Sequence, residues 1–230
     1  WHPTGQHYGI AYMIVGSAAV TAGALSFGVP LGVACAVVLG EMSSEATRSV
    51  LKPAIEILAG IPSVVFGFIG IAVVLPWIRG NLGGPGASGL AGALILGVMI
   101  LPTIIAISLD ALRTVPRSYR EASLAMGATE WQTIWHVVLP AARSGIVAAV
   151  ILGVGRAVGE TMAVVMVTGN AVQLPHSPLA PLRTLTANLA LEMAYATDDH
   201  RAALFATGVV LFFVVVLLNL VAGLARRKAR

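Results

Sequence analysis

The chain has 230 residues, of which 57% are hydrophobic and only 10% are charged, whereas about 25% of residues are charged in an ordinary soluble domain. This composition excludes a soluble globular protein, a disordered tail and a disulfide-stabilised scaffold, and it favours a lipid-embedded helical bundle. The net charge of +4 does not indicate nucleic-acid binding, because the basic residues lie beside apolar runs that are long enough to span a membrane.

Five apolar runs have the length of membrane spans, since crossing roughly 30 Å of hydrocarbon takes about 20 helical residues. They cover residues 8–40, 53–78, 90–109, 144–169 and 202–225, approximately. The first run is too long to cross the hydrocarbon upright, so we expect it to tilt or to bend at Pro30. In the second run we expect Pro53 to start the helix and Pro62 to kink it. The sequence therefore predicts an all-α integral membrane protein with a single membrane domain over residues 1–230.

Lys and Arg residues between the runs predict the orientation in the membrane. Ten of them lie on one side and three on the other, and Arg156 lies within the fourth run. The basic side carries residues 41–52, 110–143 and 226–230. Because cytoplasmic loops are enriched in Lys and Arg, we expect this side to be cytoplasmic, with Trp1 outside and Arg230 in the cytoplasm. A start outside the cell also suggests an earlier span.

The longest cytoplasmic loop has the pattern of two short helices. Ser118 and Glu121 have the spacing of a capping box, and the Ala-rich residues after them end at Gly127, which can adopt the left-handed conformation of a helix C-terminus. A second box, Thr129 to Gln132, predicts another helix, which we expect to stop before Pro140. A capped helix at the membrane surface suits docking into a groove of another protein. A helix that only connects two spans fits these residues equally well.

The same loop resembles the EAA loop of ABC importer permeases. The resemblance rests on Glu121-Ala122-Ser123, Gly127, Val137 and Leu139-Pro140, with Ser123 in place of the second Ala and Val137 in place of Ile. It implies the fold of a type I ABC importer transmembrane domain. It also implies that this loop is the coupling helix, which docks into an ATPase subunit. The residues that the resemblance places at the contact are Ser118, Arg120, Glu121, Ala122, Ser123, Gly127, Leu139 and Pro140.

Further segments resemble the phosphate importer permeases of this family. They are residues 61–67, 101–103, 115–118 and 155–164. The run Glu160-Thr161-Met162-Ala163-Val164 resembles the C-type subunit (PstC) more than its A-type partner, and so do Trp1-x-Pro3 and Tyr8-Gly9. The resemblance implies an additional N-terminal span before the five core spans.

Arg156 and Glu160 are charged residues inside the predicted fourth span. They are four residues apart, so on one helix they would share a face and could pair. A structural ion pair that locks the helices, helped by close approach at Gly155 and Gly159, is one interpretation. The other is an anion pathway in which Arg156 binds phosphate and Glu160 holds it or keeps the pathway shut. The family's charged pair falls on these positions. We expect Thr161 beside the pathway, and Ser63 either there or at a packed kink.

No catalytic site is predicted in this chain. The only lysines, Lys52 and Lys228, do not follow a glycine, so a phosphate-binding Gly-x-x-x-x-Gly-Lys loop is missing from the sequence. The histidines lack the spacing of metal ligands, so neither a metal nor a cofactor is expected. The resemblance implies that ATP and Mg²⁺ bind a partner ATPase, present in two copies. It also implies an A-type permease partner, an external phosphate-binding protein and a location in the bacterial inner membrane.

Three other functions remain open. The same machine could import another oxyanion, sulfate or molybdate, because one arginine does not specify phosphate. A passive channel or ion-coupled carrier should show internal repeats, and none is evident. An intramembrane enzyme could use Glu160 as general acid or base, with Asp110 or Glu56 as its partner, but both partners are expected near cytoplasmic ends of spans.

Overall fold

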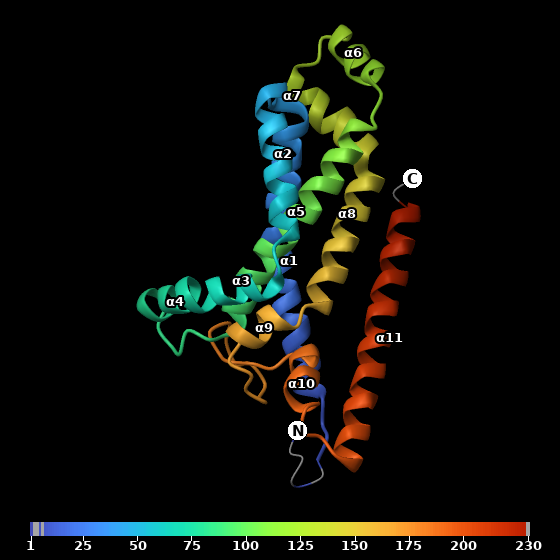
Figure 1. Ribbon diagram of the computed structural model, residues 1–230. Helices are drawn as coiled ribbons and strands as arrows, with labels where there is room; N and C mark the ends of the chain where they lie inside the picture. The colour runs from blue at the N-terminus through green and yellow to red at the C-terminus, as the bar shows by residue number, and fades with distance from the viewer. Residues whose placement is uncertain (2–4, 6, 229–230) are drawn as a thin grey trace. The chain divides into compact units, whose positions relative to one another are not determined.

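The computed structural model describes residues 1, 5 and 7–228, and the side chains of these residues except 221, 222 and 224–228. Pro3 and Arg230, on which two of the sequence predictions depend, lie outside the described residues. The described chain consists of helices joined by loops (Figure 1), with one isolated β-bridge between Gly169 and Leu182. Its helices are α1 (Ala11–Val37), η2 (Val38–Met42), α2 (Glu45–Gly60), α3 (Ser63–Ile69), η3 (Gly70–Val74), α4 (Leu75–Asn81), α5 (Gly89–Arg113), α6 (Arg117–Ala125), α7 (Glu130–Thr133), η4 (Ile134–Val138), α8 (Leu139–Gly159), α9 (Met162–Val167), α10 (Leu185–Glu192) and α11 (Asp198–Lys228).

Five helical stretches are long and apolar enough to cross a membrane, which confirms the prediction of an all-α protein with five spans. They are Ala11–Met42, Ser63–Asn81, Gly89–Arg113, Glu130–Gly159 and Asp198–Leu220. Pro30 lies inside the first of these helices, where the bend was expected. The bounds of all five differ from the prediction, those of the second and fourth by ten residues or more, for reasons that involve prolines and a break after Gly159.

The second predicted span, 53–78, is two helices rather than one kinked helix. α2 ends at Gly60, and Pro62 adopts an extended conformation (φ −58°, ψ 139°) immediately before α3. A proline disfavours the helical conformation in the residue before it, which explains a complete break at this point. Pro53, expected to start the helix, lies inside α2. The second span therefore begins at Ser63.

The fourth predicted span is displaced toward the loop at residues 110–143. α7, η4 and α8 form one continuous helix from Glu130 to Gly159, so the prediction that the second loop helix stops before Pro140 is wrong. Pro140 follows a stretch of π-helix, Ile134–Val138, and this wider turn accommodates a residue that has no N–H to donate. The helix ends at Gly159, ten residues before the predicted bound of 169.

The contacts divide the chain into two compact units, each made of three stretches of sequence. The first unit is Trp1–Phe27, Ile61–Met99 and Val154–Leu218, and the second is Gly28–Gly60, Ile100–Gly153 and Asn219–Arg230. α1, α5, α8 and α11 each contribute residues to both units. The prediction of one domain over 1–230 stays a prediction, because interleaved stretches do not define domain boundaries along the chain.

In the first unit, α3 packs against α9, and both pack against α5. Its core consists of Phe66, Ile78, Ala91, Ile95, Met99, Ala163 and Val167. Phe27 of α1 occupies the position that a Cβ on Gly97 of α5 would take, so a glycine is required for this approach. Because lipid is as apolar as these side chains, helices of this kind associate in a bilayer through close packing rather than through the hydrophobic effect.

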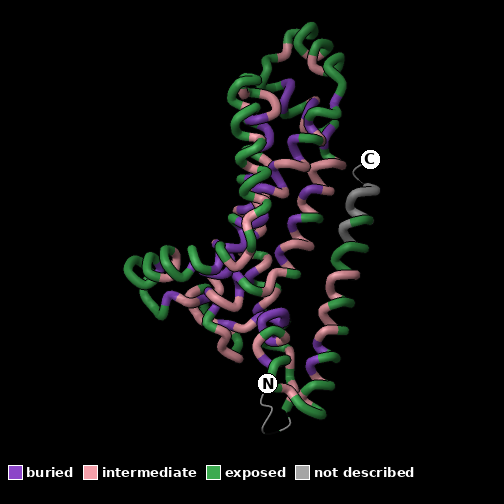
Figure 2. The backbone as a smooth tube through the Cα atoms, viewed as in Figure 1, coloured by how far each residue is buried: buried purple, intermediate pink, exposed green. Residues whose placement is uncertain are grey.

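In the second unit, α1 and η2 pack against α5, and the continuous helix from η4 into α8 closes the core. The buried residues are Ala36, Val37, Leu39, Ile105, Leu109, Leu112, Val115, Ile134, Val138 and Ala142. α2 and α6 have no buried residue, and they appear exposed along most of their length in Figure 2. This arrangement leaves α6 at one end of the unit with most of its surface accessible (Figure 1).

Candidate functional site

Arg156 and Glu160 do not form the ion pair that their spacing suggests. α8 ends at Gly159, so Glu160 lies after the helix. Its carboxylate Oε1 accepts from the amide of Ala163 at 3.2 Å in the first turn of α9, and its carbonyl accepts from the Thr186 hydroxyl at 2.8 Å. Because the helix breaks between them, the two charged residues do not share a helix face, and no ion pair joins them within the described chain.

No carboxylate of the described residues forms an ion pair with the guanidinium of Arg156. Its Nε is buried and has no hydrogen-bond partner among the described residues. A buried donor without a partner costs roughly 1–3 kcal/mol, and more when it is charged. An arrangement of this kind is expected where a further group, from a ligand or another chain, completes the site.

The surface of α8 around Arg156 is open. A Cβ built on Gly155 or on Gly159 would have nothing within 4 Å. Among the described residues, no other helix of this chain approaches these glycines closely. Small residues next to an unpaired arginine leave room for a ligand or a partner subunit at this face.

Thr161 and Ser63 belong to the same unit as Arg156, on neighbouring helices. Thr161 precedes α9 and makes only a long hydrogen bond, 3.4 Å, to the carbonyl of Gly159. Ser63 is the first residue of α3, which packs against α9. Thr161 thus lies in the break between α8 and α9, and no hydrogen bond joins the hydroxyl of Thr161 or of Ser63 to Arg156 in the described part of the chain.

Of the two capping boxes predicted in the loop at residues 110–143, the second is formed and the first is not. Thr129 accepts from the amide of Gln132 at 3.2 Å, and the Gln132 side chain accepts from the amide of Thr129 at 2.9 Å, which confirms the second box. The first box is wrong: α6 begins at Arg117, directly after Pro116, and no side chain caps it. The extended conformation of Pro116 (ψ 141°) starts the helix early, so Ser118 and Glu121 lie within it.

α6 and the turn after it are highly exposed. Glu121 and Ala122 are exposed, and Met126, at the end of α6, is 88% exposed. Gly127 has φ of +85°, the left-handed conformation predicted for it. The hydroxyl of Ser123 bonds that of Thr133 at 2.9 Å, which fixes α6 against α7. Leu139 packs against the core of the second unit, so it supports the loop from inside, while Pro140 is exposed.

Arg120 is tied to the end of the first span, whereas Glu121, beside it in sequence, forms no ion pair among the described residues. Its guanidinium forms a two-pronged ion pair with Glu41, with Nη2 2.6 Å from Oε1 and Nε 2.9 Å from Oε2. Hydrogen bonding to Glu41 raises the pKa of Arg120 further above its ordinary value, and burial opposes this only in part. No local residue pattern predicts this pair, because 79 residues separate its members.

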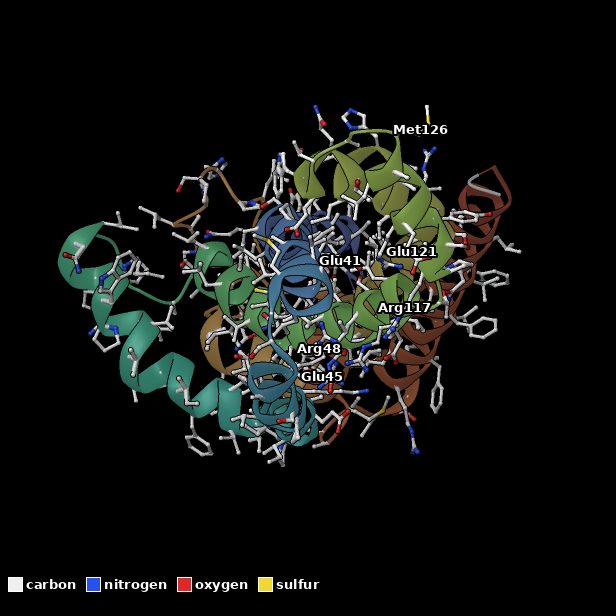
Figure 3. The ribbon with its side chains drawn as sticks, turned by 90° about the horizontal axis from the view of Figure 1, so that it is seen from above. Glu41, Glu45, Arg48, Arg117, Glu121 and Met126 are labelled. Carbon is white, nitrogen blue, oxygen red and sulfur yellow. The ribbon has the colours of Figure 1, made fainter. Side chains whose placement is uncertain are left out.

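A polar pocket of about 630 Å³ lies beside this ion pair. Its lining includes Glu41, Glu45, Arg48, Arg117 and Glu121, whose positions on three different helices are visible in Figure 3. In the same view Met126 lies at the outer edge, away from the pocket. Arg117 and Glu121 of α6 therefore line the pocket, whereas Met126 at the end of α6 does not.

A second charged cluster, also missed from the sequence, lies in the first unit. Arg183 Nη1 is 2.7 Å from Glu192 Oε1, and His200 Nε2 is 3.2 Å from Glu192 Oε2. Burial raises the pKa of Glu192, but hydrogen bonds from Arg183 and Tyr195 and the charge of Arg183 outweigh it, so the pKa is lowered. The side chain of His200 is only 12% exposed, so the ion pair lies largely out of contact with solvent.

Comparison with known proteins gives consistent matches in sequence and in fold. A family model described as binding-protein-dependent transport system inner membrane component matches residues 28–230. A probable ABC transporter permease protein of Bacillus subtilis, YqgH, is 45% identical over 95% of this chain and 73% of its own length. The phosphate transport system permease protein PstC of Mesorhizobium japonicum is 35% identical over 96% of this chain and 74% of its own length.

Solved structures share the fold at lower sequence identity. A chain of the MetNI methionine ABC transporter, crystallised in inward facing conformations, has a TM-score of 0.72 and 23% identity, over 94% of this chain and 93% of that one. A chain of a bacterial alginate ABC transporter has a TM-score of 0.69 and 17% identity, over 95% of this chain and 79% of that one. At these identities the structures establish the type I importer fold alone.

Proposed function

This chain belongs to the family of binding-protein-dependent transport system inner membrane components, among its PstC-type phosphate permeases, and we propose that it forms half of the pathway of an ATP-driven inorganic phosphate importer. The single observation within the chain that carries the proposal is the unpaired guanidinium of Arg156, with its buried Nε, on an open helix face.

Arg156 has the chemistry that an oxyanion pathway requires. A guanidinium is always charged and presents a planar fork of donors that matches phosphate oxygens. Ionisable residues within membrane spans are costly and generally functional. Since Glu160 caps α9 through Ala163, Arg156 keeps its positive charge for the transported anion. Glu160 and Thr161 shape the break beside it, and Ser63 is the further polar group that we assign to the pathway.

The exposed helix α6 is the surface that we assign to ATPase coupling. Glu121, Ala122 and Met126 are accessible, while Ser123 and Arg120 fix the helix from its inner side. In this proposal two copies of a cytoplasmic ATPase subunit bind ATP and Mg²⁺, dock on the coupling helices of the two permease subunits and hydrolyse ATP. This chain itself supplies no catalytic group.

The remaining partners follow from the incompleteness of one permease chain. Five spans do not enclose a pathway, so a homologous A-type permease is expected to complete it, and an external phosphate-binding protein to deliver the ion. ATP binding would turn the spans outward, and hydrolysis would return them inward. We place Trp1 outside and the C-terminus in the cytoplasm, because the basic loops then lie in the cytoplasm.

Another oxyanion is the competing substrate, since sulfate would also bind a guanidinium. The test is uptake of labelled phosphate into proteoliposomes that carry the complex purified through this chain, with the binding protein outside, ATP inside and sulfate as competitor. Uptake that requires ATP and resists sulfate is expected. Uptake without ATP would indicate a carrier or channel. ATPase activity stimulated by the binding protein, without phosphate uptake, would discard the substrate and keep the machine.

A further inference from the structure

The cytoplasmic end of the first span is held by arginines from two different helices. Arg48 of α2 donates to the carbonyls of Leu39 at 2.8 Å and Gly40 at 2.7 Å, in the last turn of the helix. Arg120 of α6 binds the side chain of Glu41 in the same turn. The side chain of Glu41 is 10% exposed and that of Arg120 is 23% exposed, so the second contact is largely shielded from water.

Arg120 also fixes the junction between α5 and α6. Its Nη1 donates to the carbonyl of Val115 at 2.9 Å, and its Nη2 to that of Leu112 at 3.1 Å. These two bonds satisfy carbonyls at the C-terminal end of α5 that have no partner within the helix. Together with the bonds to Glu41, one guanidinium joins the end of α5, the end of the first span and α6.

No other hydrogen bond or ion pair joins α6 to α1 or η2 in the part of the chain that the structure describes. Along the chain, α6 connects to α5 through Thr114–Pro116 and to α7 through the turn at Gly127. The first span is not adjacent to α6 in the sequence, since 79 residues separate Glu41 from Arg120. A two-pronged guanidinium–carboxylate pair is directional as well as strong, so it can transmit a rotation or a displacement.

We propose that Glu41 and Arg120 are positioning residues that pass movement of the coupling helix α6 directly to the first span. The proposal rests on the proposed function, since it presumes that α6 moves with the ATPase subunits. Loss of the pair would leave α6 joined to its chain neighbours, to the end of α5 through Arg120 and to α7 through Ser123, but not to the first span by any hydrogen bond or ion pair among the described residues. ATP hydrolysis would then continue while less of its movement reached the first span.

The first test is the variant Glu41→Gln, which keeps the shape of the side chain and removes its charge. In proteoliposomes of the assembled complex, we expect phosphate transported per ATP hydrolysed to fall by about fivefold or more, the lower end of typical coupling between sites. The matched control is Lys52→Gln. It removes the ion pair of Lys52 with Asp110 (3.7 Å), which joins α2 to α5 in the same unit and does not involve α6. The control should leave the ratio unchanged.

A second test leaves the ion pair itself unchanged and substitutes only residues outside it. Spin labels are placed on Met42→Cys and Met126→Cys, in a Cys35→Ala background, since Met42 and Met126 are 61% and 88% exposed. A rigid connection predicts the same narrow distance distribution with and without a non-hydrolysable ATP analogue. A distance that changes when the analogue binds would overturn the proposal.

The outcomes separate this inference from the proposed function. An unchanged ratio of transport to hydrolysis in Glu41→Gln, beside a wild-type complex that takes up phosphate with ATP, would overturn the inference alone. A fall of the same size in Lys52→Gln would also overturn it, because the effect would then be general loosening of the unit. A wild-type complex that hydrolyses ATP without taking up phosphate would overturn the proposed substrate, while the label distances would still test the connection.

Discussion

Arg120 and Arg156 each have a glutamate close by in sequence, and the structure treats them in opposite ways. Arg120 pairs with Glu41 of the first span rather than with its neighbour Glu121, and it makes four hydrogen bonds in all. Arg156 has Glu160 one helical turn away in sequence, yet its Nε has no partner among the described residues. Four of the five N–H donors of Arg120 are hydrogen-bonded, whereas the Nε of Arg156 is free to bind a group outside the described chain.

The difference shows how a structural arginine and a functional one can be distinguished. An arginine whose donors are occupied by carbonyls and a carboxylate stabilises the fold, and its charge is already compensated. An arginine with a buried, unpartnered donor beside two glycines that border open space is arranged for a group outside the chain. Structural ion pairs are therefore formed by Arg120 and by Arg183. No described residue forms one with Arg156, where an ion pair was one of the two interpretations.

The largest effect is expected from Arg156→Ala. Since Arg156 compensates no carboxylate, its removal should leave assembly intact, and phosphate uptake should fall by about 100-fold, as expected when a central charged contact of roughly 3 kcal/mol is lost. Uptake and the amount of co-purified ATPase subunit are measured together. Loss of assembly at normal uptake per complex would show that Arg156 is structural, as Arg120 is.

Reversal of charge at Glu121 tests the outward side of the coupling helix. Glu121 is exposed and has no ion-pair partner in the described chain, so Glu121→Lys should not disturb the fold of this subunit. Because it reverses the charge at the proposed contact with the ATPase, ATP-driven uptake should be lost while membrane insertion persists. The matched variant Glu130→Lys changes an exposed glutamate of the same loop outside α6 and should retain uptake. Normal uptake by Glu121→Lys in a verified complex would remove the coupling assignment.

Substitution of Arg183, which makes three hydrogen bonds within the chain, should change stability without changing transport. Arg183→Met leaves the carboxylate of Glu192 buried beside a neutral side chain, at a cost of about 2 kcal/mol at pH 7, or roughly 4–8 °C in Tm for a chain of this size. Because the folded-state pKa of Glu192 is lowered below its usual 4.5, the stabilisation is present above that value and lost as the pH falls through the folded-state pKa. The difference in Tm between wild type and variant should therefore shrink below about pH 4.5. A difference that is independent of pH would exclude an ionic origin.

The two capping boxes allow a smaller effect to be compared within one loop. Thr129→Ala removes a formed box and should destabilise the protein by about 1 kcal/mol, whereas Ser118→Ala should change stability by less than about 0.5 kcal/mol, since Ser118 caps no helix. Thermal unfolding of the purified complex measures both. Equal losses would mean that Ser118 also caps α6.

The smallest effect is expected from Glu160→Gln. The bond that Glu160 makes is accepted by Oε1 from the amide of Ala163, and the amide oxygen of Gln can accept it in the same way. Uptake and stability should both remain within about a factor of two and 0.5 kcal/mol of wild type. A strong loss of uptake would show that the charge of Glu160, and not only its capping bond, serves the pathway.

The sequence predicted the features that depend on local residue patterns. Apolar runs of span length locate the five membrane helices, and the spacing from Thr129 to Gln132 and the single Gly127 locate a helix start and a helix end. The prediction was wrong where one proline overrides such a pattern. Pro116 starts α6 two residues before Ser118, and Pro62 ends a helix that apolar composition alone would continue.

Contacts between distant parts of the chain had no signal in the sequence. Glu41 and Arg120 lie 79 residues apart, and neither belongs to a recognisable spacing. Glu160 was predicted to lie within the fourth span, but it follows the end of α8. The prediction failed because the break after Gly159 falls in a run that stays apolar on both sides. The arginine of the candidate pathway was nevertheless identified from the sequence, since an ionisable residue within a span is rare enough to indicate a site. Its lack of a partner required the structure.

The most direct test of the central claim, that the charge of Arg156 contacts the transported anion, is chemical rescue of Arg156→Cys in a Cys35→Ala background. This variant should have lost uptake. Reaction with an aminoethyl methanethiosulfonate, which attaches an ammonium group, should restore a measurable part of ATP-driven phosphate uptake, and the uncharged methyl reagent should not. Equal rescue by both reagents, or none by the cationic reagent at complete labelling, would contradict the claim.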